Sequence, residues 1–196
     1  TVSLIDRDRL DRYLSQDLAD AVRYEPGVSV PEDASRFGLQ GFTIRGLSGN
    51  RVGMALDGVP LADGFAIGSF SNAGRMPVDS AFLARMEILR GPASTLYGSD
   101  ALAGVVSLRT WRPQDLLAAD GFGGRTDAVG LGRDGSTALS GVSAWRGGRF
   151  EIVAGMVRRQ GRERETMPRP GGLDANPSER SQHSEMLKFG LDAGDG

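Results

Sequence analysis

Hydrophobic and polar positions follow two different patterns, which divide the chain near residue 115. Before this point, short alternating segments stand beside segments with a helical period. Residues 1–5 (TVSLI) alternate as a short strand does, and Asp6 can cap a helix over about residues 7–14. The first part is therefore expected to be a mixed α/β unit, with short helices and a small mixed sheet.

Capping and stop signals place a second helix before the next strands. Ser15 is expected to be its N-cap, and Glu25-Pro26-Gly27 should end it. Asp57-Gly58 signals a tight turn further along the chain. Three short strands are expected between the helix stop and the Asp57-Gly58 turn, in the segments GVSV, FTIR and RVGMAL.

The run Arg85–Thr110 (RMEILRGPASTLYGSDALAGVVSLRT) has two apolar strands around a middle of glycine and small polar residues. The first strand should end at Gly91-Pro92, because proline removes a backbone donor from the ladder. Two clipped helical turns then follow, and the chain should return to a strand at Val105. The turn residues expected in the first part of the chain are Gly46, Gly58, Gly91, Pro92, Tyr97, Gly98 and Gly104.

After residue 125 the helical period disappears and alternating segments of about ten residues take its place. Two turns between them are short, whereas residues 161–181 are long, charged and rich in proline and glycine. Transmembrane β-barrels use strands of this length and alternate short and long connections. A soluble antiparallel sheet predicts the same alternation. The four segments are TDAVGLGR, STALSGVSAWR, RFEIVAGMVRR and HSEMLKFGLDA.

Composition excludes several classes of function. The chain has 23 basic and 25 acidic residues, so no cationic surface for nucleic acid is expected. It has no cysteine and a single histidine, His183, which excludes thiolate and histidine-cluster metal sites within the chain. No uncharged apolar run approaches the roughly 18 residues of a membrane-spanning helix.

Sequence motifs of soluble enzymes are either incomplete in this chain or lack the flanking strand and helix that they require. The Arg85–Thr110 run has no lysine for a phosphate loop and no Gly-x-Ser-x-Gly elbow for a nucleophile. Residues 130–135 (GLGRDG) satisfy a dinucleotide-binding fingerprint, but no apolar strand precedes them and no helix follows. These six residues are expected to form a hairpin turn.

Four segments in the same order carry a resemblance to a known family. The Arg85–Thr110 run resembles the signature of the plug domain of TonB-dependent outer-membrane receptors, and the resemblance covers about residues 2–112. Segments similar to the haem and haemoglobin receptor branch are SRFGLQGFTIRGLSGNRV, RPQDLL and NPSERSQHSEMLKF. The other segments that carry the family resemblance are DLADAVRYEPGVSV, FTIRGLSGNRVGMALDGVPL and VDSAFLARMEILRGP.

The resemblance implies an N-terminal mixed α/β plug, residues 1–115, inside a 22-stranded transmembrane β-barrel that begins in residues 116–196. Only about four strands fit in this second part, so the chain is expected to be a fragment of the receptor. Such receptors lie in the outer membrane, in contact with its lipid, with the plug inside the barrel facing the periplasm. They catalyse no reaction and import their ligand with energy relayed by the inner-membrane TonB complex.

The resemblance also suggests roles for individual residues. A plug–barrel interface or gating role is implied for Arg45, Asp57, Glu87 and Arg90. Loops that face outward would offer Phe37, Phe65, Phe70 and Arg75 to a flat apolar ligand with carboxylates, and His183 could approach haem iron. Haem would be the transported ligand rather than a permanently bound cofactor, and no resident metal is expected.

Three alternatives to a haem receptor stay open at this point. A receptor of the same family could carry ferric siderophores or another scarce nutrient. The plug could be a free-standing soluble binding module of the periplasm. A soluble dinucleotide-binding enzyme would instead require a strand–helix–strand unit around residues 130–135.

Overall fold

The computed structural model describes residues 1–15, 17–30, 41–62, 78–93, 101–131, 135–162 and 179–191. The chain forms two compact units, Thr1–Thr110 and Trp111–Gly196. Their division lies slightly before residue 115, where the sequence pattern changes. Among the described residues, no helix is long and apolar enough to cross a lipid bilayer.

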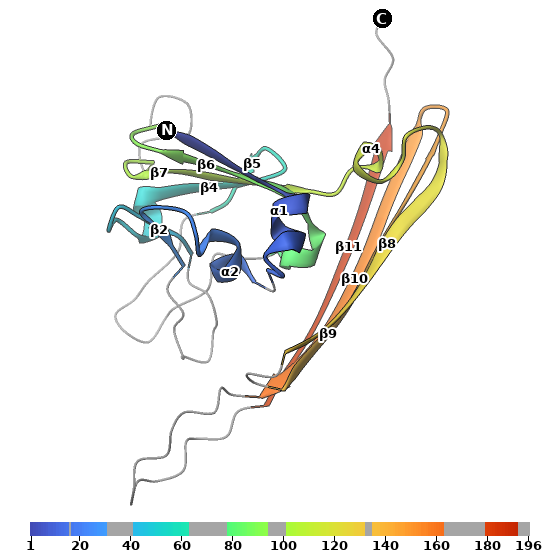
Figure 1. The fold of residues 1–196 in the computed structure, drawn as a ribbon. Coiled ribbons are helices and arrows are strands. Elements are labelled where there is room, and N and C mark those ends of the chain that lie inside the picture. Colours follow the sequence, from blue (N-terminus) through green and yellow to red (C-terminus); the bar gives the residue numbers. More distant parts are fainter. Residues whose placement is uncertain are drawn as a thin grey trace, which may run out of the picture. The chain divides into compact units, whose positions relative to one another are not determined.

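The first unit is built on a five-stranded mixed sheet with strand order β1-β6-β7-β4-β5 (Figure 1). β4 and β7 are parallel, and the other neighbours are antiparallel. A separate two-stranded sheet pairs β2 with β3. The strands are β1 (Val2–Asp6), β2 (Val28–Ser29), β3 (Thr43–Ile44), β4 (Val52–Leu56), β5 (Val59–Pro60), β6 (Leu83–Arg90) and β7 (Gly104–Thr110).

Short helices pack beside this sheet. Helix α1 (Arg7–Arg12) begins where the Asp6 side chain accepts a hydrogen bond from the backbone N–H of Arg9, which confirms the predicted cap. Helix α2 (Leu18–Val22) is capped by Asp17, which accepts from the N–H of Asp20, so the prediction that Ser15 caps it was wrong. Single 3-10 turns occupy Gly49–Arg51 and Ser80–Phe82.

Apolar residues from the helices and both sheets form the main core of the first unit. Alternation in β6 and β7 buries one set of side chains, and the helices add Leu10, Leu18 and Val22. The largest fully buried side chains of this core are Ile5, Leu10, Val22, Phe42, Ile44, Val52, Leu83, Met86, Ile88, Val106 and Leu108.

Two of the predicted turns place non-glycine residues in the left-handed region. Arg45 and Asp57 have φ of +50°, and each is followed by a glycine with positive φ, Gly46 at +82° and Gly58 at +86°. The Asp57 carboxylate accepts hydrogen bonds from the N–H and hydroxyl of Thr110, at 2.9 and 2.5 Å. This bond pair offsets the left-handed backbone and joins the end of β4 to the end of β7.

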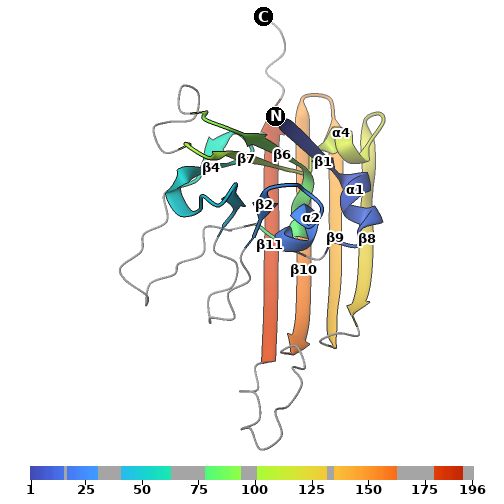
Figure 2. The ribbon, with the colours of Figure 1, turned by 60° about the vertical axis from the view of Figure 1, so that its left-hand side comes forward.

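The second unit is a four-stranded antiparallel meander with strand order β11-β10-β9-β8 (Figure 2). β8 and β9 pair directly from Gly121↔Arg146 to Leu131↔Ser136, so the dinucleotide fingerprint joins two hairpin strands, as predicted, and a nucleotide-binding βαβ unit is excluded there. A short helix, α4 (Pro113–Leu116), precedes the sheet. The strands are β8 (Gly121–Leu131), β9 (Ser136–Gly147), β10 (Phe150–Arg162) and β11 (Glu179–Leu191).

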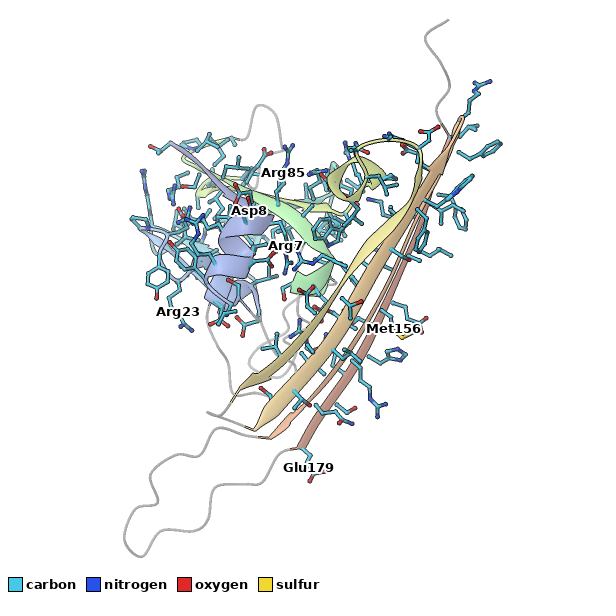
Figure 3. The ribbon with its side chains drawn as sticks, turned by 45° about the vertical axis from the view of Figure 1, so that its right-hand side comes forward. Arg7, Asp8, Arg23, Arg85, Met156 and Glu179 are labelled. Carbon is cyan, nitrogen blue, oxygen red and sulfur yellow. The ribbon has the colours of Figure 1, made fainter. Side chains whose placement is uncertain are left out.

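The two faces of this sheet differ in chemistry. The covered face packs against α4 and carries the buried side chains of Val142, Ala144, Val153 and Val157. On the same face, the Lys188 ammonium donates to the Trp111 carbonyl at 3.2 Å. The other, open face bears Met156, which points away from the sheet in Figure 3.

Candidate functional site

Arg90, at the end of β6, occupies a buried site inside the first unit. Its side chain is 7% exposed, and each guanidinium nitrogen has a partner. Nε donates to the Pro26 carbonyl at 3.1 Å, and one terminal nitrogen donates to the Ser3 hydroxyl at 2.8 Å. The other terminal nitrogen donates to Oε2 of Glu25 at 2.6 Å.

Glu25 binds a second cation through its other oxygen. The Arg9 guanidinium, from α1, lies 2.6 Å from Oε1, and the Glu25 side chain is only 4% exposed. Ser3, Arg9, Glu25 and Arg90 are called the Glu25 cluster below. The cluster joins β1, α1, the turn after α2 and β6, so it connects four structural elements from three separate segments of the chain.

The electrostatics of Glu25 reflect two opposing effects. Burial raises the pKa of this carboxyl, but hydrogen bonds from Ser3 and Arg90 and the charges of Arg9 and Arg90 outweigh burial. The net result is a pKa lowered from 4.5. Glu25 is therefore ionised in the folded protein at neutral pH and neutralised by two arginines.

Stability should depend on this carboxyl in acid. Since the folded-state pKa is below the unfolded-state value of 4.5, the contribution of Glu25 is fully present above that value and is lost as the pH falls through the folded-state pKa. We expect the difference in thermal midpoint between the wild type and Glu25→Gln to shrink below about pH 4.5. Unfolding scans of both proteins between pH 7 and 3 measure it, and a constant difference would contradict the prediction.

The local sequence explains why Glu25 points inward. Leu18, Ala21 and Val22 are the buried positions of α2, and Glu25 continues their i, i+3, i+4, i+7 spacing. The Glu25 N–H donates to the Val22 carbonyl at 2.9 Å, which carries the helical turn one step further. Sequence reasoning treated this segment only as a helix stop and missed the carboxylate. An acidic residue on the apolar stripe of a short helix is the signal that could have found it.

The other residues for which the resemblance implied an interface role occupy different surroundings. Glu87 lies on β6 beside Arg85 at 3.0 Å, and both side chains are more than 40% exposed. Arg45 is exposed in the turn after β3, where its N–H donates to the Gly27 carbonyl at 2.7 Å. The structure thus brings none of Arg45, Asp57 or Glu87 into the Glu25 cluster. Among the described residues, the hydrogen-bond and ion-pair partners of Arg90 all lie in the first unit, so its pairing with a barrel carboxylate stays a prediction.

Most of the predicted ligand contacts lie outside the described residues. This is true of Phe37, Phe65, Phe70 and Arg75, and also of the turn residues Tyr97 and Gly98. His183 is exposed on β11, directly opposite Arg158 of β10 and 3.6 Å from the Glu185 carboxylate. Within the described part of the chain, no group of three or more His, Cys, Asp or Glu side chains could hold a metal ion.

The open face of the second unit carries an exposed apolar band. Near the Gly148-Arg149 turn, the register aligns Phe122, Trp145, Ile152 and Phe189 in one row across the four strands. Phe122 and Phe189 are 76% and 74% exposed, respectively. Soluble proteins rarely expose such a contiguous surface, whereas membrane barrels carry aromatic rows at the edge of their apolar band. The other large exposed apolar side chains of this face are Leu139, Phe150, Met156, Leu187 and Leu191.

The far edge of the band crosses the strands obliquely. It is formed by Leu187 on β11, Met156 on β10 and Leu139 on β9. Leu187 pairs with Ala154, two positions before Met156, and Met156 pairs with Gly141, two positions from Leu139. The far edge is therefore offset by two residues from each strand to the next, whereas the aromatic row crosses the strands in direct register.

Comparison with protein families gives a match over the first unit. The model of the TonB-dependent Receptor Plug Domain matches residues 1–105. The "Hemoglobin and hemoglobin-haptoglobin-binding protein A" of Haemophilus influenzae is 32% identical over 202 aligned residues, which cover 93% of this chain. The chain spans only 19% of the length of that relative.

Solved structures share the fold of both units. The hemophore receptor HasR of Serratia marcescens, solved with its hemophore HasA and heme, has a TM-score of 0.78 and 23% identity over 97% of this chain and 29% of its own. The FrpB iron transporter of Neisseria meningitidis has a TM-score of 0.79 and 21% identity over 100% of this chain and 30% of its own. These two solved structures therefore contain the same fold, a mixed sheet with short helices followed by antiparallel strands.

Proposed function

Because the chain belongs to the TonB-dependent receptor plug domain family through residues 1–105, we propose that it is the plug and first barrel strands of an outer-membrane receptor for haem or a haem protein. The receptor would bind its ligand outside the cell and import it with energy relayed by TonB. Members of this family are receptors and transporters, and haem would be the cargo rather than a resident cofactor. The first unit is assigned to the plug and the second to the start of the barrel wall.

One observation carries the choice of haem. The relative named for binding hemoglobin and hemoglobin–haptoglobin is 32% identical over 93% of this chain, so its likeness extends through both units. The fold alone supports only the wider class of receptors for iron sources, because the structure of an iron transporter matches this chain as well as that of a hemophore receptor does. A receptor for a ferric siderophore or another iron source is therefore the second candidate.

The open face supports membrane insertion over a free-standing periplasmic module. Its aromatic row lies beside the short Gly148-Arg149 turn, and the longer connection, residues 163–178, joins β10 and β11 at the other end of the sheet. Because bacterial outer-membrane barrels have short periplasmic turns and longer external loops, we assign the short turn to the periplasmic side. The apolar band then contacts outer-membrane lipid.

Haem titration of the full-length receptor tests the ligand. Purified receptor should develop a haem absorption band that saturates at a fixed stoichiometry, and cells that depend on it should grow on haem or haemoglobin as sole iron source only when TonB is present. Growth on a ferric siderophore without haem binding would favour the second candidate. TonB-independent growth would overturn the energy-coupled mechanism.

A charge on the open face should impair insertion. Leu187→Arg places a guanidinium at the far edge of the apolar band, and we expect it to destabilise the folded barrel by about 1 kcal/mol, the upper value for positions near the edge of the bilayer. Ser184→Arg is the matched control, because Ser184 lies on the covered face of the same strand, as Lys188 does. Urea-dependent folding of the full-length receptor into phospholipid vesicles measures both. Equal effects of the two substitutions would contradict a lipid-facing role.

A further inference from the structure

The N-terminal strand β1 is held at one edge of the plug sheet. Among the described residues its five positions pair only with β6, and the side chains of Val2 and Leu4 are exposed. A short edge strand can detach from one end, because its hydrogen bonds break one after another rather than together. Backbone pairing alone would therefore give β1 little resistance to a force applied at its N-terminal end.

The Glu25 cluster lies at the end of β1 where such detachment would begin. The Arg90 N–H donates to the Thr1 carbonyl at 2.9 Å, and the Arg90 guanidinium donates to the Ser3 hydroxyl at 2.8 Å. Arg90 is held in turn by Glu25 and by the Pro26 carbonyl. Removing β1 therefore disturbs a side-chain network as well as a pair of strands.

Burial raises the free energy needed to break the hydrogen bonds and ion pairs of this network. Glu25 and Arg90 are almost fully shielded from water, and a buried ion that loses one partner cannot recover its hydration while the surrounding core stays closed. The Arg23–Asp20 pair on α2 differs in this respect, since the Arg23 side chain is 52% exposed and lies at the surface in Figure 3. Exposed pairs of that kind contribute little.

We propose that the Glu25 cluster is a latch that keeps β1 in the plug and must open before a pull on the N-terminal side can release the plug. The inference rests on the proposed function, because it assumes that energy reaches the plug through its N-terminal end. Glu25 is the positioning residue: it holds Arg90 against Ser3 on β1. Arg9 fixes Glu25 from α1, so the helix and the strand are released together.

Amide exchange in the full-length receptor, reconstituted in lipid nanodiscs, tests the latch without any ligand. Glu25→Gln keeps the size of the side chain but leaves two arginines without their carboxylate, and the amides of β1 should exchange about tenfold to a hundredfold faster. Arg23→Ala is the matched control, which should leave β1 exchange unchanged. Ser3→Ala, which removes one hydroxyl and keeps the buried ion pairs, should accelerate exchange less and serves if Glu25→Gln fails to fold.

A reversible staple tests the requirement for release. Val2 and Leu89 face each other beside the hydrogen-bonded Thr1–Arg90 pair, so they form a pair with closely spaced side chains. The chain has no other cysteine, so Val2→Cys with Leu89→Cys gives a single possible disulfide within it. The oxidised receptor should bind haem as the wild type does but import less than about a tenth as much, and a reductant should restore import.

The outcomes separate the latch from the function on which it rests. Unchanged β1 exchange in both Glu25→Gln and Ser3→Ala would overturn the latch, as would equal acceleration by Arg23→Ala. Normal import by the oxidised staple would overturn the need for β1 release. A wild-type receptor that imports no haem would overturn the proposed haem function, while the exchange rates would still decide whether the latch exists.

Discussion

Replacement of Arg90 by alanine should lower the free energy of unfolding of the plug by about 3–5 kcal/mol, the range for breaking a buried ion pair from one side. The substitution leaves Glu25, which is 4% exposed, with Arg9 as its only cation in the cluster. It also removes the donors to the Ser3 hydroxyl and the Pro26 carbonyl. Amide exchange of the core strands in the full-length receptor gives the change in opening free energy.

The control for Arg90 lies on the same strand. Arg85 pairs with Glu87, but both side chains are solvent-exposed, and Figure 3 shows Arg85 at the surface. Arg85→Ala should therefore change the same free energy by less than about 1 kcal/mol. A loss at Arg90 no larger than the loss at Arg85 would show that the buried cluster does not stabilise the plug.

Gly104→Ala is expected to destabilise the plug by about 3 kcal/mol or more, because two effects add at one position. Gly104 has φ of +152°, a backbone angle that residues other than glycine rarely adopt. A Cβ there would lie 2.1 Å from the backbone carbonyl oxygen of Leu89, which cannot move without disturbing β6. Thermal unfolding of the full-length receptor should show a lower midpoint and a loss of protection in β6 and β7.

Gly91→Ala is the control that tests backbone strain at positive φ without a steric clash of the new Cβ. Gly91 also has positive φ, +118°, but nothing lies within 4 Å of the position that a Cβ would take there. We expect a loss of about 1 kcal/mol from the backbone alone. If Gly104→Ala and Gly91→Ala have the same effect, the close approach of β6 to Gly104 does not limit the fold.

The sequence predicted elements whose signals are local. Asp6 capped its helix, Asp57-Gly58 turned the chain, and the fingerprint at residues 130–135 joined hairpin strands. The predicted N-cap of α2, Ser15, was wrong because Ser15 and Asp17 are both good capping residues and lie only two positions apart. Only the packed structure selects between them, since it is the position of Leu18 in the core that fixes where the helix begins.

The candidate site was harder to predict, because its residues are far apart in the sequence. Arg90 was singled out by resemblance alone, whereas its partners Ser3 and Glu25 are 87 and 65 positions away. Alternation in the second half likewise could not separate a membrane strand from a soluble one. The distinction became visible once the register aligned Phe122, Trp145 and Phe189 across neighbouring strands.

The order of strands in the plug sheet has a consequence for biosynthesis. β1 is made first, yet its partner β6 begins at Leu83, and β4 must wait for its parallel neighbour β7, which ends at Thr110. Such distant pairing delays folding, because the intervening chain must be brought together first. The sheet therefore cannot close before Thr110 has emerged, and until then β1 and β4 lack their strand partners β6 and β7.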